Sequence, residues 1–125
     1  MINKQDSEMQ LITAFELMWG KYTEPVMLID RKFNIIAINE AYKATGGVAG
    51  IVGGKCNVLN PELHNGCKAM VALNTQVTQV KTIEMEGIKH TTLWIPIPNF
   101  PDYFIHLANG ANEYFEKLKR KNLNY

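Results

Sequence analysis

The sequence predicts an α+β fold in which a five-stranded antiparallel sheet carries helices on one face. Two short apolar segments come first, a helical region follows, and three longer apolar segments fill the C-terminal half. Strands joined by tight turns pair antiparallel, and a sheet with one apolar face needs helices to cover it. Amphipathic segments at the two ends of the chain predict one further flanking helix on each side.

The two short apolar segments predict a β-hairpin followed by a short helix. Residues 26–29 and 33–38 are apolar, rich in β-branched side chains and too short for helices. Three polar residues, 30–32, separate them, which predicts a tight turn between two antiparallel strands. Asn39 is placed to cap the first amides of a short helix after the second strand.

Residues 6–19 predict an amphipathic helix at the N-terminus. Ser7 and Gln10 have the spacing of a capping box, and Gly20 stands where the helix should end. The apolar stripe of this helix consists of Leu11, Ile12, Phe15, Met18 and Trp19. Such a stripe predicts either a cover for the chain's own sheet or the contact surface of a homodimer.

The middle of the chain predicts irregular turns followed by a helix. Five glycines fall within residues 46–54, and their spacing matches neither the P-loop nor the Rossmann phosphate-binding pattern. An Asn-Pro pair at residues 60–61 is a helix start, and helical spacing of apolar residues continues to about Thr75. Because Gly66 costs roughly 1 kcal/mol relative to alanine inside a helix, a start near Cys67 is the alternative.

Three strands complete the predicted sheet. Residues 77–86 and 88–98 read as long strands joined by a turn, and residues 103–109 supply the fifth strand after a turn at 99–102. Two prolines near the end of the second of these strands cannot donate ladder hydrogen bonds. That end should therefore lie at a sheet edge or twist away.

The C-terminal residues 111–123 predict a helix with a basic, solvent-facing side. Its apolar stripe consists of Ala111, Tyr114, Phe115 and Leu118. The helical pattern runs on without a stop signal, so we expect the chain to be the leading part of a longer polypeptide. The basic and aromatic side chains here do not extend into a wider positive surface, and no nucleic-acid site is expected.

Composition limits the class of protein. With 125 residues the chain should form one domain, and a net charge of +1 gives no general attraction to nucleic acid or membranes. The sequence has no apolar run near the roughly 20 residues needed to span a bilayer and no apolar signal core at its start. Two cysteines do not make a disulfide framework. We expect a cytoplasmic protein.

The order of these elements resembles the PAS sensory-domain family. The positions that carry the resemblance are Asp30, Ile35, Ile38, Asn39 and Ala41. They follow the family pattern of an apolar strand, a second strand and an Asn-x-Ala helix start. The resemblance covers residues 22–110, which leaves 1–21 as an N-terminal helix and 111–125 as a connector helix.

The resemblance implies a sensory module of a bacterial signalling protein that is not itself an enzyme. Such a module binds a small ligand or cofactor and relays a change of state to an attached kinase, diguanylate cyclase or chemoreceptor domain. The expected pocket side chains are Tyr42, Cys56, Met70, Trp94 and His106. The apolar stripes of the two terminal helices are more than one small sheet easily covers, which predicts a homodimer through the leading helix. The alternatives are a ligand-free dimerisation module, in which these side chains are solid core, and a metal or thiol redox switch.

The redox-switch hypothesis involves Cys56, His64 and Cys67. In a helix that begins at residue 61, His64 and Cys67 share a face, with Cys56 just upstream. Two thiolates and an imidazole can bind zinc, and a thiol pair can report redox state. The spacings typical of zinc sites are absent, and Cys67 also fits the apolar stripe of its helix as a small buried side chain.

Flavin and haem are not expected as cofactors, and the sequence does not identify the ligand. Cys56 falls in a faint copy of the flavin-binding motif of the light-oxygen-voltage branch of the family. Where that motif has an asparagine and a phosphate-binding arginine, this chain has Lys55 and Asn57. His64 is the histidine nearest to the position at which some PAS proteins bind haem, and the C-x-x-C-H haem signature is absent.

Overall fold

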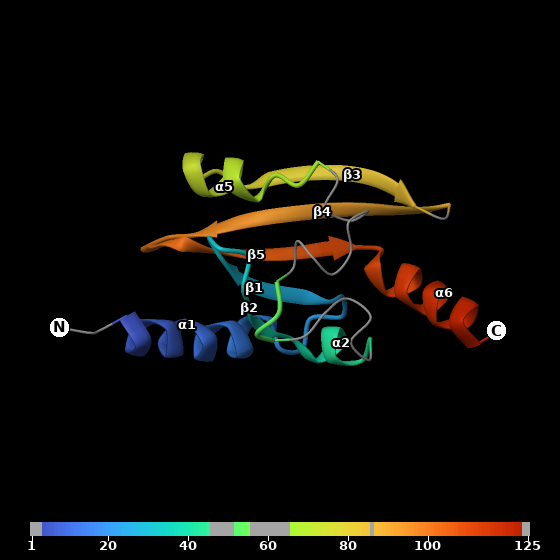
Figure 1. Cartoon of the computed structure of the whole chain (residues 1–125), viewed down its shortest axis with the longest axis horizontal. Helices are drawn as coiled ribbons and strands as arrows, with labels where there is room; N and C mark the ends of the chain where they lie inside the picture. Colours follow the sequence, from blue (N-terminus) through green and yellow to red (C-terminus); the bar gives the residue numbers. More distant parts are fainter. Residues whose placement is uncertain (1–3, 46–51, 56–65, 86, 124–125) are drawn as a thin grey trace.

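The computed structural model describes residues 4–45, 52–55, 66–85 and 87–123. Its centre is a five-stranded antiparallel sheet with the order β2-β1-β5-β4-β3 (Figure 1). The strands are β1 (Val26–Asp30), β2 (Ile35–Ile38), β3 (Gln79–Met85), β4 (Ile88–Ile97) and β5 (Phe100–Asn109). The helices are α1 (Lys4–Trp19), α2 (Glu40–Lys43), α5 (Ala69–Thr75) and α6 (Ala111–Leu123). The predicted α+β architecture is confirmed.

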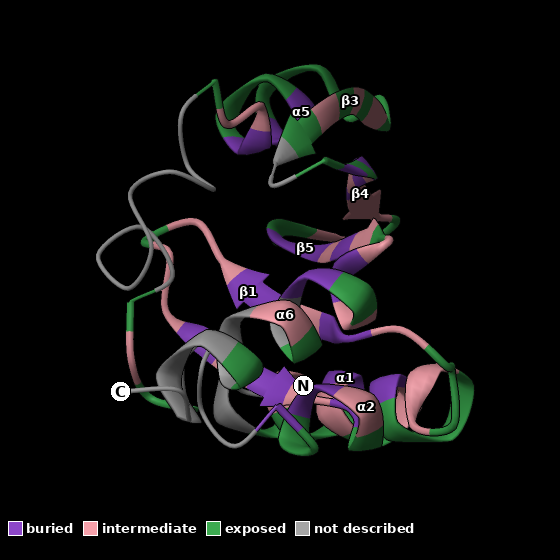
Figure 2. Ribbon diagram, turned by 90° about the vertical axis from the view of Figure 1, so that its right-hand side faces the viewer, coloured by how far each residue is buried: buried purple, intermediate pink, exposed green. Residues whose placement is uncertain are grey.

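Alternate residues of β1 divide the core between the two faces of the sheet. Val26 and Leu28 pack with Leu11 and Phe15 of α1, whereas Ile29 packs with residues of α5. Successive strand residues point to opposite faces. Helix α1 therefore covers one face, which we call the outer face, and α5 covers the other, the inner face. In Figure 2 the buried residues follow β1 and β5 through the centre of the fold.

The apolar stripe of α1 covers the chain's own sheet. Leu11 and Phe15 are buried, and Ile12 and Trp19 pack partly against the same cluster. Met18 is the exposed member of the stripe. The structure thus corrects the predicted dimer contact at Leu11 and Phe15, because side chains already used in the core have no surface to offer to a second copy.

The first hairpin has a longer turn than predicted. One carboxylate oxygen of Asp30 accepts hydrogen bonds from the backbone nitrogens of Lys32 and Asn34, both at 2.9 Å. Phe33 adopts a left-handed conformation with φ 67°. This local side-chain turn holds residues 31–34 out of the ladder, and β2 begins only at Ile35.

The hairpin between β4 and β5 is tighter than predicted. Ile97 pairs with Phe100, which leaves a two-residue turn in which Asn99 has φ 70°. Strand β5 therefore begins inside residues 99–102, where the sequence predicted a turn. The register with β5 shifts next to Pro96, and β3 pairs with β4 only as far as Trp94, so this end lies at a sheet edge as predicted.

Helix α5 begins at Ala69, later than the predicted helix start near residue 61. Gly66 has φ 76°, a left-handed conformation that a right-handed helix cannot contain. Cys67 consequently precedes the helix. The segment that holds His64, residues 56–65, lies outside the described residues.

Helix α6 starts directly after β5 and extends beyond the end of the sheet (Figure 1). Gly110, with φ 102°, joins the two elements, and a Cβ atom there would collide with the carbonyl oxygen of Lys89. Only glycine fits this close approach. None of the described helices is long and apolar enough to cross a bilayer.

Candidate functional site

Two of the predicted pocket residues lie together on the inner face of the sheet. Trp94 of β4 and His106 of β5 are register partners, and their ring centroids are 5.3 Å apart. Phe104, two residues before His106 on the same strand, continues the aromatic group with a centroid distance of 6.5 Å. Buried residues of α5 close over Trp94 and Phe104. The inner face thus carries an aromatic group beneath a short helix.

The indole of Trp94 is buried with its polar atom unpaired. The residue is 2% exposed and packs in one cluster with Ile29, Ile35 and Phe104. Within the described residues, its Nε1 atom has no hydrogen-bond partner. A buried donor without an acceptor costs about 1–3 kcal/mol, so an acceptor brought by a bound molecule would be favoured here.

The other three predicted pocket residues have different outcomes. Tyr42 is fully buried on α2. Met70 is exposed on α5, because Ala69 and Ala72 are the residues that this helix turns toward the sheet, and its assignment to the pocket is corrected. Cys56 lies outside the described residues.

Cys67 packs against the inner cluster. It is half-buried and a free thiol, and it contacts the group of residues around Trp94. In the part of the chain that the structure describes, no group of three His, Cys, Asp or Glu side chains is arranged to bind a metal ion. Because Cys56 and His64 fall outside that part, the zinc or redox hypothesis stays a prediction.

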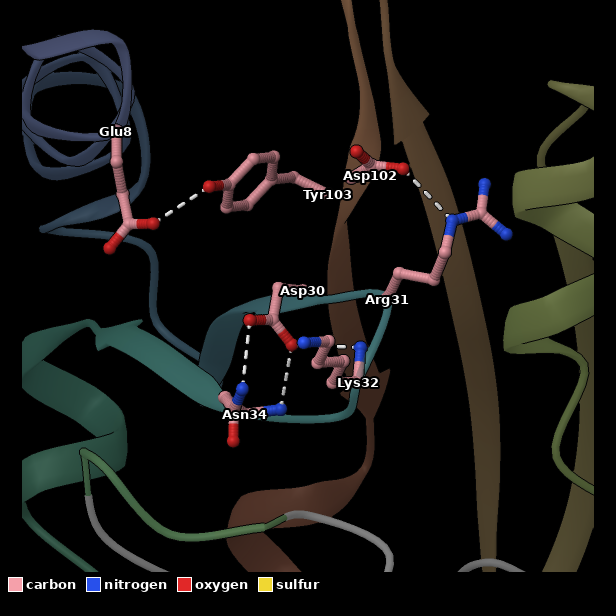
Figure 3. Close-up of a pocket in the computed structure, with 7 residues that line it drawn as sticks. All are labelled: Glu8, Asp30, Arg31, Lys32, Asn34, Asp102 and Tyr103. Atoms are coloured by element: carbon pink, nitrogen blue, oxygen red, sulfur yellow. Dashed lines mark hydrogen bonds and ion pairs between the residues drawn. The ribbon is translucent and has the colours of Figure 1, made fainter. Parts of the chain in front are cut away.

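A surface pocket of about 270 Å³ opens between α1, the β1–β2 turn and the start of β5 (Figure 3). This pocket does not lie at Trp94 and His106, where the resemblance implies a ligand. The pocket is lined almost entirely by charged side chains and by Tyr103. Of these residues, the sequence singled out Asp30 alone, as a turn residue.

The charged groups of the surface pocket pair with one another. Tyr103 of β5 donates a 2.7 Å hydrogen bond to Glu8 of α1, and Arg31 lies 2.9 Å from Asp102. Burial raises the pKa of Tyr103 above its ordinary value, and the hydrogen bond to Glu8 raises it further, so the phenol stays a donor. Arg31 also donates to Asn74 of α5 at 3.3 Å. These contacts connect α1 and the first hairpin to β5, and the first hairpin to α5.

Asn39 has a larger role than the predicted helix cap. Its side chain is 2% exposed, and Oδ1 accepts from the backbone nitrogens of Tyr42 at 3.0 Å, which is the cap, and of Val26 at 2.9 Å. The side-chain nitrogen donates to three carbonyl oxygens, those of Trp19 at 3.2 Å, Tyr22 at 3.2 Å and Glu24 at 2.9 Å. One amide therefore joins α1, the linker (residues 20–25), β1 and α2.

Comparisons with known proteins support the fold. No protein-family model matches the sequence, and no curated protein matches it at a significant level. The sensory box sensor histidine kinase structure from Vibrio cholerae aligns with a TM-score of 0.58 at 11% identity, over 87% of this chain and 96% of that one. The BvgS PAS domain from Bordetella pertussis aligns with a TM-score of 0.54 at 14% identity, over 93% of this chain and 99% of that one.

A domain of an HTR-like protein from Haloarcula marismortui gives a TM-score of 0.57 at 14% identity, over 70% of this chain and 96% of that one. At such low identities the likeness concerns the fold. The chain has the fold of PAS sensory domains, as its sequence predicted.

Proposed function

We propose that this chain is a PAS-type sensory module, which binds a small molecule on the inner face of its sheet and signals to an attached output domain. The observation that supports ligand binding is the buried Nε1 atom of Trp94, which has no acceptor among the described residues. The surrounding side chains of Ile29, Ile35 and Phe104 favour a largely apolar ligand with a hydrogen-bond acceptor.

The position of α6 supports the relay. This helix leaves the end of β5 and extends beyond the sheet, where a following domain would be attached. A matched structure of the same fold is that of a sensor histidine kinase. In this proposal the chain is a regulatory part of a bacterial cytoplasmic protein, and catalysis belongs to the output domain.

Native mass spectrometry tests ligand binding on protein purified from the expression host. We expect a mass above that of the chain, released when the sample is denatured. Trp94→Phe keeps an aromatic ring but removes the N–H. It should lower the affinity for the ligand about tenfold, the equivalent of one hydrogen bond, and so reduce the fraction of protein with ligand bound. Met70→Ala, at an exposed position, is the control and should bind as wild type. A native mass equal to that of the chain would instead favour the ligand-free module.

We also propose that the module forms a homodimer, with its contact on the outward side of α1. Met9 and Leu17 are exposed and lie about two turns apart, on the side away from Phe15. Leu17, at 86% exposure, is the most exposed large apolar side chain among the described residues. An exposed apolar helix side of this kind is typical of a partner contact.

Light scattering tests the dimer. Wild-type protein at about 100 μM should show twice the chain mass, and Leu17→Glu should show the mass of one chain, because a charge at the contact is costly to bury. Met70→Glu, on α5, should remain dimeric. A wild-type protein that stays monomeric at this concentration would contradict the proposal.

A further inference from the structure

His90 occupies the junction of β4, the linker and α6. It is 1% exposed, and its ring contacts that of Tyr114 on α6 edge-on, with the centroids 5.1 Å apart. Gly110, at the start of α6, approaches the His90 backbone closely. No described residue gives the Nε2 atom a hydrogen-bond partner. The proposed function leaves this buried titratable side chain without a role.

Acidic groups face His90 from two elements. Glu24 belongs to the linker and Glu113 to α6, and both carboxylates raise the pKa of His90. Burial has the larger effect and lowers this pKa below the ordinary value, so the ring is neutral at neutral pH. On β4 itself, the adjacent Lys89 is exposed and points to the opposite face of the sheet.

The start of α6 is held to the linker by polar contacts. Glu24 Oε1 accepts a 3.0 Å hydrogen bond from the backbone nitrogen of Asn112, which satisfies a free amide of the first helical turn. The Asn112 side chain donates to the carbonyl oxygen of Thr23 at 2.6 Å, and Tyr22 donates to Asn109 at 2.9 Å. These bonds can break without disturbing the strand pairing.

We propose that His90 is a proton-sensitive latch for α6, in which uptake of a proton favours displacement of the first turn of this helix. A buried imidazolium needs water or a carboxylate at its unpaired nitrogen. Among the described residues, Tyr114 covers the ring, and its movement with the first turn would give water or a carboxylate access. The latch itself does not depend on a ligand, and only the claim that the displaced helix carries a signal rests on the proposed function.

The direction of the pH dependence follows from linkage. In the closed state the pKa of His90 is lowered, while in a state with α6 displaced it returns toward 6.5. The closed state is therefore fully favoured above pH 6.5 and loses its advantage as the pH falls below that value. Between pH 7.5 and pH 5.5 the displaced fraction should therefore rise, by at most about tenfold, the limit set by the displaced-state pKa near 6.5.

Amide hydrogen exchange measured by NMR tests the latch on the full chain. Protection factors in the first turns of α6 should fall between pH 7.5 and pH 5.5, by at most about tenfold, while those of β1 and β5 stay constant. His90→Phe retains the aromatic contact with Tyr114 but cannot titrate, so protection of α6 should no longer depend on pH. His106→Phe, at a second described histidine of the inner face, should retain the wild-type dependence.

Three results would overturn the latch. They are a pH-independent protection of α6 in wild type, a pH dependence retained in His90→Phe, and an equal loss of protection in β1 and β5. The ring of His90 can also be followed directly by NMR in wild type, and an apparent pKa at or above 6.5 would overturn it without any variant. None of these outcomes bears on ligand binding at Trp94, which mass spectrometry tests separately.

Discussion

Replacement of Asn39 by leucine is expected to destabilise the protein by about 4 kcal/mol, a large part of the 5–15 kcal/mol typical of a domain. The leucine side chain fills a similar volume but leaves the amides of Val26 and Tyr42 without an acceptor. It also removes the side-chain donor from three linker and helix carbonyl groups, of which that of Trp19 still accepts from the backbone nitrogen of Tyr22. Each buried group left unpaired costs about 1–3 kcal/mol, and partial access to water reduces the total.

Urea unfolding monitored by circular dichroism measures this effect. Asn74→Leu is the matched control, because Asn74 is exposed and receives a single 3.3 Å hydrogen bond from Arg31. Its effect should stay within about 0.5 kcal/mol. Asn39→Asp keeps both acceptor contacts and loses the donors, so its stability should lie between that of Asn39→Leu and wild type. If Asn39→Leu and Asn74→Leu unfolded at the same urea concentration, the five hydrogen bonds of the Asn39 side chain would not contribute to the stability of the fold.

The elements predicted from sequence are those whose cause lies within a few residues along the chain. The strands at 26–29 and 88–98 follow from apolar, β-branched runs, and α6 begins where helical spacing begins. Errors occurred where one side chain or one backbone angle decided the boundary. The Asp30 carboxylate delays β2, and the left-handed Gly66 rules out one continuous helix from residue 61 to Thr75, which leaves the alternative start near Cys67 close to the observed Ala69.

The candidate site was harder to predict because its contacts join distant segments. The pattern at Asn39 predicts the cap on Tyr42, three residues away, whereas the carbonyl partners lie 15 to 20 residues earlier in the chain. His90 falls within the strand predicted at residues 88–98, but its contact with Tyr114 depends on how α6 leaves the sheet. Periodicity places residues on a face of an element and does not say which other element covers that face.

Helix α1 illustrates this limit and gives the second large expected effect. Its stripe predicted a surface for a partner or a cover for the sheet, and the structure places Phe15 in the outer core with 1% exposure. Leu17, two residues further along, is 86% exposed. Phe15→Ala should therefore cost about 3–5 kcal/mol through lost burial and the cavity left behind. Leu17→Ala should change the stability by less than about 0.5 kcal/mol.

Both variants are compared with wild type by urea unfolding at a protein concentration low enough to keep all three monomeric. This condition matters because Leu17 lies in the proposed dimer contact, where association would add its own stabilisation. A large loss of stability for Phe15→Ala in the monomer means that α1 is part of the domain and is not ordered by a partner. If Phe15→Ala lost less than about 1 kcal/mol, α1 would be detached from the sheet in solution. The stripe with Leu11 and Phe15 would then be free to contact a second copy. That result would contradict the proposed dimer contact on the outward side of α1.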